Sequence, residues 1–244
     1  RCEDMGDHYR INGQKIWTSG AQWADWCFCL VRTDPTKKHE GISFVLFTMH
    51  QPGVEVRPIK LIAGSSPFCE TFLTDARAEK KDLVGPLNAG WTIGKRLLQH
   101  ERSSISSMGN ALGGSTALPD LAKAYVGVDT QGRLADSDLR TRIVSNEMDG
   151  RAFQQTAMRA MAEAKGNAGP SAATSIMKNA GTRWIQDRAE LTLEIMGHQG
   201  LGWAGEDFAP AELEAVRSWL GGKASTIYGG SQEVQNNIIS KRIL

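Results

Sequence analysis

Turn residues and apolar runs change their spacing once along this chain, between residues 82 and 90, and this change strongly limits the possible folds. Before it, short apolar runs are separated by Gly, Pro, Asn and Asp, a pattern typical of strands and turns. After Gly90, long stretches with few breakers predict helices. We therefore expect an α+β protein, with a small all-β, barrel-like domain at residues 1–85 and an antiparallel four-helix bundle at residues 86–244.

Six strands are expected in the β domain. Asn12-Gly13, between two short extended runs, is a hairpin signature. Breaks at residues 34–35, 51–53 and 64–67 separate the apolar runs that follow. In the helical domain, Ser231 is expected to cap a last helix. The other expected helix starts and breaks lie at Trp91, Gly113-Gly114, Pro119, Asp136, Pro170 and Ala209.

Composition excludes several classes of protein. Net charge is +1, from 28 basic and 27 acidic residues, so nucleic acid and anionic membranes are not expected partners. Cys27 and Cys29 alternate in an apolar run, and no second pair at metal spacing accompanies the four cysteines. We expect reduced core thiols, no metal site and a cytoplasmic location. No apolar run is long enough to span a membrane. Because the chain begins at Arg1 in a charged stretch without methionine, an upstream part is expected to be missing.

Glu101 lies in the stretch LLQHERSSI, residues 97–105, among aliphatic neighbours one helical turn away. One interpretation is that Glu101 is an acid on the helix surface, paired with a neighbouring Lys or Arg side chain, since Glu is an ordinary helix former. The other is a general base in a dry pocket, where removal from water raises proton affinity. The choice between them depends on the rest of the chain.

Several motifs follow one another along the chain: INGQKIWTSGAQWADW (11–26), GISFVLF (41–47), GVEVRPI (53–59), LVGPLNAGW (83–91), LLQHER (97–102), EIMGHQGLGW (194–203) and TIYGGSQEVQNNIISKRIL (226–244). Taken in order, they resemble the acyl-CoA dehydrogenase family of flavoproteins. The resemblance extends from the family's middle β domain to its C-terminal helical domain, and implies α,β-dehydrogenation of an acyl-CoA with FAD as cofactor. The family's N-terminal helical domain would precede Arg1, so the chain is expected to be a fragment, or else to be completed by a partner chain.

Three groups of residues match positions that contact FAD in this family. Trp17, Thr18 and Ser19 match a contact to the isoalloxazine ring, with a core position for Trp17 as the alternative when it is considered without the surrounding motif. The second group matches a glycine turn that meets the adenosine and diphosphate end of FAD from a neighbouring subunit; it comprises Glu194, Gly197 and His198. The third matches the segment whose helix N-terminus faces the cofactor; it comprises Ser231, Gln232 and Glu233.

The chain departs from the commonest family pattern at two places. Many members carry the catalytic glutamate directly after the tyrosine of the C-terminal loop, where this chain has Gly229. It resembles instead the isovaleryl and long-chain enzymes, whose glutamate precedes an arginine on the long helix, as Glu101 precedes Arg102. The resemblance thus implies Glu101 as α-proton base, the backbone N–H of Gly229 as a donor to the thioester, and Arg102 and Gly230 near the substrate.

The second departure concerns an arginine-x-x-phenylalanine-glycine element that grips FAD in many members. It has no clear counterpart here, although Arg133 and Arg140 are candidates to replace it. The small residues of SSISSMG, 103–109, suggest a roomy pocket for long or ring-bearing acyl chains.

The resemblance also implies partners: an electron-transfer flavoprotein as electron acceptor, and assembly as a homo- or heterotetramer. Two alternatives stay open at this point. One is an acyl-CoA oxidase-like enzyme that passes electrons to oxygen, and the other is a non-catalytic subunit of a heteromeric dehydrogenase.

Overall fold

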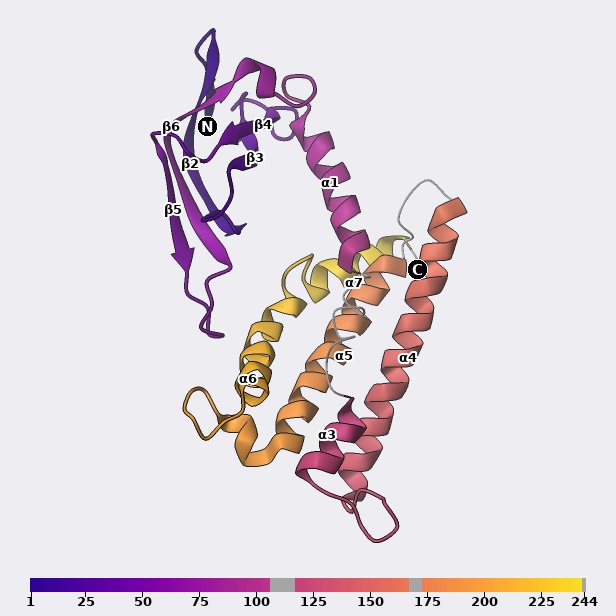
Figure 1. Ribbon diagram of the computed structural model, residues 1–244. Helices are drawn as coiled ribbons and strands as arrows, with labels where there is room; N and C mark the ends of the chain where they lie inside the picture. Colours follow the sequence, from indigo (N-terminus) through magenta and orange to yellow (C-terminus); the bar gives the residue numbers. More distant parts are fainter. Residues whose placement is uncertain (106–116, 167–172, 243–244) are drawn as a thin grey trace. The chain divides into compact units, whose positions relative to one another are not determined.

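The computed structural model describes residues 1–105, 117–166 and 173–242, with the backbone alone at residues 99–105, 161, 164–166, 173–174 and 242. It divides into two compact units, Arg1–Leu98 and Gln99–Leu244. The first unit contains the strands and the second most of the helices, so the α+β class is confirmed (Figure 1). Among the described residues, no helix is both long and apolar enough to cross a membrane.

Two antiparallel sheets form the β unit (Figure 1). The larger has the strand order β1-β2-β6-β5 and the smaller pairs β3 with β4. The long strands β2 and β6 form the centre of the larger sheet, because each is paired on both sides. The bounds are β1 Cys2–Asp4, β2 His8–Ser19, β3 Trp26–Arg32, β4 Ile42–Thr48, β5 Val54–Ile59 and β6 Phe68–Glu79.

The hairpin expected at Asn12-Gly13 is wrong. These residues lie inside β2, which continues to pair with β6 on both sides of a register shift between Ile11 and Gly13. Gly13 has a φ of 150°, and Asn12 exchanges two hydrogen bonds with Asp75, Nδ2 to Oδ1 at 2.9 Å and Oδ1 from the backbone N–H at 2.8 Å. The sequence signal therefore marks a bulge in a long strand, which also favours glycine.

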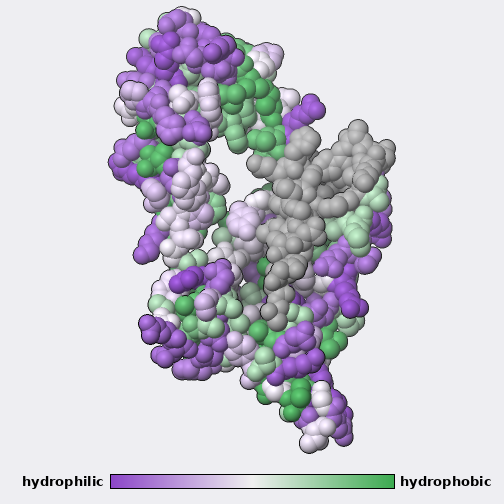
Figure 2. All heavy atoms as spheres, in the orientation of Figure 1, coloured by the Kyte–Doolittle hydropathy of each residue, from purple (hydrophilic) through white to green (hydrophobic). Residues whose placement is uncertain are grey.

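The core of the β unit lies between the inner faces of its sheets. Val45 and Cys69 are fully buried, and Phe47 and Ile11 nearly so. All four cysteines are free thiols; burial raises the pKa of Cys2 and of Cys27 to about 11, which keeps both protonated. Figure 2 shows further hydrophobic side chains on the flank of this unit next to β3, β4 and the start of α1.

Helices of the second unit pack mainly around α5 (Figure 1). The sequence correctly predicted the positions of the helices after Asp136, and Ser231 caps α7 by accepting a hydrogen bond at Oγ from the N–H of Val234 at 3.4 Å. Helix α1, Gly90–Ile105, begins in the first unit and ends in the second. The other bounds are α3 Leu118–Tyr125, α4 Ser137–Gly166, α5 Ala173–Met196, α6 Pro210–Gly222 and α7 Gln232–Arg242, with short 3-10 turns η2 Gly197–Leu201 and η3 Lys223–Thr226.

Helices α4 and α5 approach each other through two glycines, each of which accepts an aromatic ring from the other helix. A Cβ on Gly150 of α4 would lie 2.6 Å from the indole of Trp184, and one on Gly181 of α5 would lie 2.7 Å from the ring of Phe153. The two rings are 5.7 Å apart, and Trp184 Nε1 donates to the carbonyl of Asn146 at 3.0 Å. This reciprocal contact fixes how α4 and α5 align.

Candidate active site

Trp17 stands on a strained backbone at the end of β2. Its φ of 61° is rare for a bulky residue, and the register with β6 shifts between Lys15 and Thr18. The indole is 57% exposed and contacts Phe68 edge-on at a centroid distance of 6.2 Å. Within the β unit, Trp17 is thus no core residue. A strained residue that holds a large apolar ring in the open is typical of a ligand contact.

The neighbours of Trp17 differ in what they offer a ligand. Thr18 Oγ1 donates to the carbonyl of Cys69 at 2.8 Å and lies 2.8 Å from Thr71 Oγ1. Its single proton is therefore engaged within the sheet, which leaves its hydroxyl only as an acceptor. Ser19 is exposed at the strand end. The hydroxyl of Ser19 is accordingly an available donor beside the indole.

Glu101 and Arg102 lie in α1 by their backbones. Their side chains are outside the described part of the structure, as are residues 106–109 of the SSISSMG segment. The choice between a surface ion pair and a buried base at Glu101 consequently stays a prediction. What the structure establishes is that the glutamate belongs to a helix and not to a loop.

The turn between η3 and α7 contains two consecutive left-handed glycines. Gly229 has a φ of 68° and Gly230 a φ of 94°. After them, α7 begins with Gln232 and Glu233 in its first turn. Hydrogen bonds from its own backbone amide and from the Ser231 hydroxyl lower the pKa of Glu233, so this helix start already holds one carboxylate. The predicted residues 229–233 thus form one compact turn.

Three polar side chains that were not predicted from the sequence contact this turn or the segment that leads into it. Lys178 is 3% exposed and donates to the carbonyl of Thr226 at 3.1 Å; its burial lowers its pKa. Gln186 donates to the carbonyl of Gly222 at 3.1 Å. Gln235, 2% exposed, donates to the carbonyl of Gly229 at 2.8 Å. In sequence these residues look like ordinary solvated helix positions, so only the burial of Lys178 and Gln235 and the backbone contact of Gln186 identify them.

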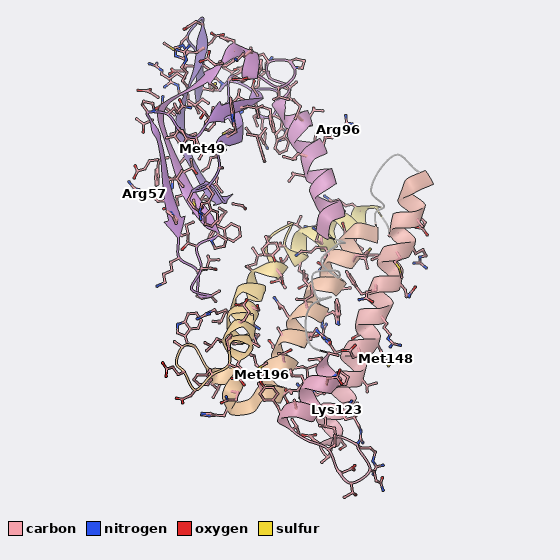
Figure 3. All side chains as sticks on the ribbon, in the orientation of Figure 1. Met49, Arg57, Arg96, Lys123, Met148 and Met196 are labelled. Carbon is pink, nitrogen blue, oxygen red and sulfur yellow. The ribbon has the colours of Figure 1, made fainter. Side chains whose placement is uncertain are left out.

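The predicted glycine turn lies at the other end of α5, near Met196 (Figure 3). Gly197 has a φ of 57° and His198 is exposed. Glu194 forms a two-pronged ion pair with Arg142 of α4, with N–O distances of 2.7 and 2.6 Å. Its carboxylate therefore stabilises the α4–α5 contact, and any ligand there has to compete with the guanidinium.

The two predicted cofactor turns of the helical unit are far apart. The η3–α7 turn lies beside Lys178 near the start of α5, whereas Gly197 follows the end of that helix. At 1.5 Å per residue, α5 separates them by roughly 27 Å. Hence the structure does not bring both turns to one place within a single chain, as expected if the second contacts FAD bound mainly by a neighbouring subunit.

Arg133 and Arg140 show no common ligand site. Arg133 pairs with Asp129 at 3.4 Å, and Arg140 donates to the carbonyl of Leu134 at 3.1 Å. In the described residues, no group of three His, Cys, Asp or Glu side chains is placed to hold a metal ion. The parts that suit FAD are the exposed indole with open donors at the end of β2 and the side-chain-free glycine turn before α7.

Comparison with protein families decides the ancestry of this chain. The family model "Acyl-CoA dehydrogenase, C-terminal domain" matches residues 88–244, and "Acyl-CoA dehydrogenase, middle domain" matches residues 2–76. The chain belongs to the acyl-CoA dehydrogenase family. Among its relatives is acyl-CoA dehydrogenase IpdE1 of Mycolicibacterium smegmatis, 35% identical over 242 residues, which cover 97% of this chain and 57% of the relative. This family member thus spans little more than half of that protein's length.

Solved acyl-CoA dehydrogenase structures share the fold. The ChsE4-ChsE5 complex from Mycobacterium tuberculosis is 27% identical with a TM-score of 0.82, over 98% of this chain and 62% of the other. The Tcur3481-Tcur3483 steroid ACAD is 25% identical with a TM-score of 0.85, over 99% of this chain and 62% of the other. Family membership confirms the resemblance found in the motifs, and the fold expected from it.

Proposed function

We propose that this chain is the catalytic portion of an FAD-dependent acyl-CoA dehydrogenase that oxidises the α,β carbon–carbon bond of an acyl-CoA thioester. The observation that carries the proposal is the pairing of family membership with a C-terminal turn that has glycine at position 229, while Glu101 lies on α1. A turn without a side-chain base needs a proton acceptor elsewhere, and Glu101 is the candidate that the motif comparison supplies.

Glu101 removes the α-proton in this proposal. The α-carbon is too weakly acidic for a carboxylate in water, so the base has to be desolvated, which strengthens its affinity for the proton. The negative charge that develops on the thioester oxygen needs hydrogen-bond donors placed in advance. The backbone N–H of Gly229 is one such donor, with Arg102 and Gly230 beside the substrate.

Trp17 and Ser19 would hold FAD at its ring, with Thr18 as an acceptor, and Gln232 and Glu233 would lie beside it after the Ser231 cap. Glu194, Gly197 and His198 would contact FAD in a neighbouring subunit. When bound, FAD accepts the β-hydrogen as a hydride. The exposed indole of Trp17 would cover the ring and keep water from it.

The acyl group is proposed to be large. The SSISSMG segment that follows Glu101 is rich in small residues, which would leave room in the pocket, and one structural neighbour is described as a steroid ACAD. A ring-bearing acyl-CoA is therefore the first substrate class to test, and an electron-transfer flavoprotein is the proposed acceptor. Turnover that is fastest with short straight chains would contradict the large pocket.

An oligomer is proposed as the active form. Two neighbours of similar fold carry paired names, ChsE4-ChsE5 and Tcur3481-Tcur3483, which supports a heteromer. On α4, the exposed residues Met148 and Met158 lie about 40° to either side of exposed Val144 around the helix axis. Exposed apolar side chains on one helix face are typical of an interface.

We also propose residue 85 as the boundary between the β domain and the helical domain.

The test is the visible spectrum of the purified protein followed by titration with acyl-CoAs. We expect a yellow protein whose flavin absorbance is bleached, and Glu101→Gln is expected to slow bleaching at least about 1000-fold. Glu163→Gln is the matched control, because Glu163 is an exposed acid on α4 with only a 3.8 Å pair to Arg159.

Three results would contradict the proposal. If flavin absorbance in Glu101→Gln bleaches as fast as in the wild type, Glu101 is not the base. Rapid oxygen consumption without an added acceptor would indicate an oxidase. A colourless holo-preparation would favour a non-catalytic subunit.

A further inference from the structure

Gln235, in the first half of α7, is a buried amide directed at the C-terminal turn. It is 2% exposed, and its Nε2 donates to the carbonyl of Gly229 at 2.8 Å. Since a carbonyl only accepts hydrogen bonds, this contact fixes which end of the amide faces the turn. Its Oε1 is buried and has no hydrogen-bond partner among the described residues. An unpaired buried acceptor costs free energy. The hydrogen bond from Nε2 is therefore the interaction that favours an amide at this position.

This contact restrains the glycine turn where it would otherwise be free. Upstream, the N–H of Tyr228 donates to the carbonyl of Ala224 at 3.1 Å. Downstream, Gln235 anchors the carbonyl of Gly229. The N–H of Gly229 thus lies between two anchored atoms, in a residue whose φ of 68° leaves the backbone many alternatives.

The turn closes directly onto the Gln235 amide. A Cβ built on Gly230 would collide with Nε2 of Gln235, so no ordinary side chain fits between them. The amide therefore packs against the turn from beneath and leaves the opposite side of the turn clear of this contact. Nothing in the predicted cofactor or substrate motif required a residue at this position.

We propose that Gln235 is a positioning residue, which holds the N–H of Gly229 in the direction needed to stabilise the thioester oxygen as it becomes negative. This proposal rests on the function proposed above, because it needs Gly229 as the donor. The donor matters more for the developing enolate than for the bound thioester, so loss of alignment lowers kcat more than it raises KM.

Gln235→Met and Gln235→Glu test the proposal in the FAD-loaded holoenzyme. Methionine keeps the length but donates nothing, and we expect kcat to fall about 10- to 100-fold while KM changes less than about threefold. Glutamate donates to the Gly229 carbonyl only when protonated. Burial favours the protonated form, so the kcat of Gln235→Glu relative to wild type should be highest at low pH and should fall as the carboxyl ionises.

Other titrating groups are shared by the variant and the wild type, so the ratio of their kcat values removes their contribution. They are Lys178 of α5, Lys223 of η3, Tyr228 of the turn and Glu233 of α7. A ratio that stays flat across a pH range in which the introduced carboxyl is shown to ionise would overturn the proposal. Because this comparison needs only one folded variant, it decides the question even if Gln235→Met does not fold.

Asn146→Leu is the matched control for burial. Asn146 is 5% exposed, also has an unpaired amide oxygen, and donates to the carbonyl of Trp184 at 3.3 Å, away from the turn. We expect this variant to lose stability and to keep its kcat. Wild-type kcat in Gln235→Met, or an equal loss in Asn146→Leu, would overturn the positioning role alone. A wild-type holoenzyme that no acyl-CoA reduces would overturn the proposed function, and this inference with it.

Discussion

At the scale of single residues, Trp17 combines an unfavourable backbone with an unfavourable exposure. A left-handed φ of 61° and an indole that is 57% exposed both disfavour the folded state. Natural chains keep such residues where function needs them. From the sequence, Trp17 is only a tryptophan in an expected strand, so a core position for it could not be excluded without the backbone.

Trp17→Gly is expected to separate stability from cofactor binding. Glycine removes roughly 1–2 kcal/mol of left-handed strain, while loss of the edge contact with Phe68 costs about 0.5–1.5 kcal/mol. We expect the melting temperature of the apoprotein to change little and the Kd for FAD to rise about tenfold or more. Trp23→Ala is the control, because Trp23 is a 76% exposed indole outside the predicted site. Equal FAD affinity in the two variants would contradict the role of Trp17.

Secondary-structure elements were easier to predict than the contacts that orient them. Long helices such as α4 and α5 follow from periodic apolar residues and from the breakers that flank them. The Asn12-Gly13 hairpin failed because a bulge and a tight turn demand the same glycine, and only the length of β6 shows that β2 continues. Likewise, the base proposed on α1 was predicted from a motif, whereas the burial of the Gln235 amide depends on packing that no local pattern encodes.

Gly150→Ala tests the aromatic interlock between α4 and α5. The new Cβ would lie 2.6 Å from a rigid indole that is also held by a hydrogen bond, so overpacking should cost about 1–3 kcal/mol of unfolding free energy. Better helix propensity offsets up to about 1 kcal/mol of this. Denaturant titration should give a lower midpoint with an unchanged m-value. Gly222→Ala, with no atom within 4 Å, should be neutral or stabilising, and equal behaviour of both would refute the interlock.

At the scale of the whole molecule, each unit has its own buried core. The chain covers 57% of its relative IpdE1. On the helical unit, the two turns predicted to contact FAD are far apart, which suits the proposed sharing of FAD with a neighbouring subunit. On the outer face of α4, Arg151 and Gln155 accompany the exposed apolar residues, and Met with Arg is a composition favoured in interfaces.

Met148→Lys should weaken the proposed association of subunits through the exposed face of α4. Met148 is 64% exposed on α4 (Figure 3), and a charge at the centre of an interface loses its hydration. We expect light scattering to show a shift from oligomer toward a 26.6 kDa subunit, with loss of bound FAD. Ser145→Lys adds the same charge about 60° further around the helix and should leave the mass unchanged. A yellow monomer in either preparation would contradict FAD sharing between subunits.

The interlock of α4 with α5 also bears on inheritance. Gly150 faces Trp184 and Gly181 faces Phe153, so each pair combines a large aromatic ring with a residue that has no side chain. If a substitution removes either ring, the glycine that faces it can be replaced by a larger residue. If the glycine is enlarged first, the contact between α4 and α5 is destabilised. These four sites should therefore covary among descendants of this chain, however far their substrates diverge.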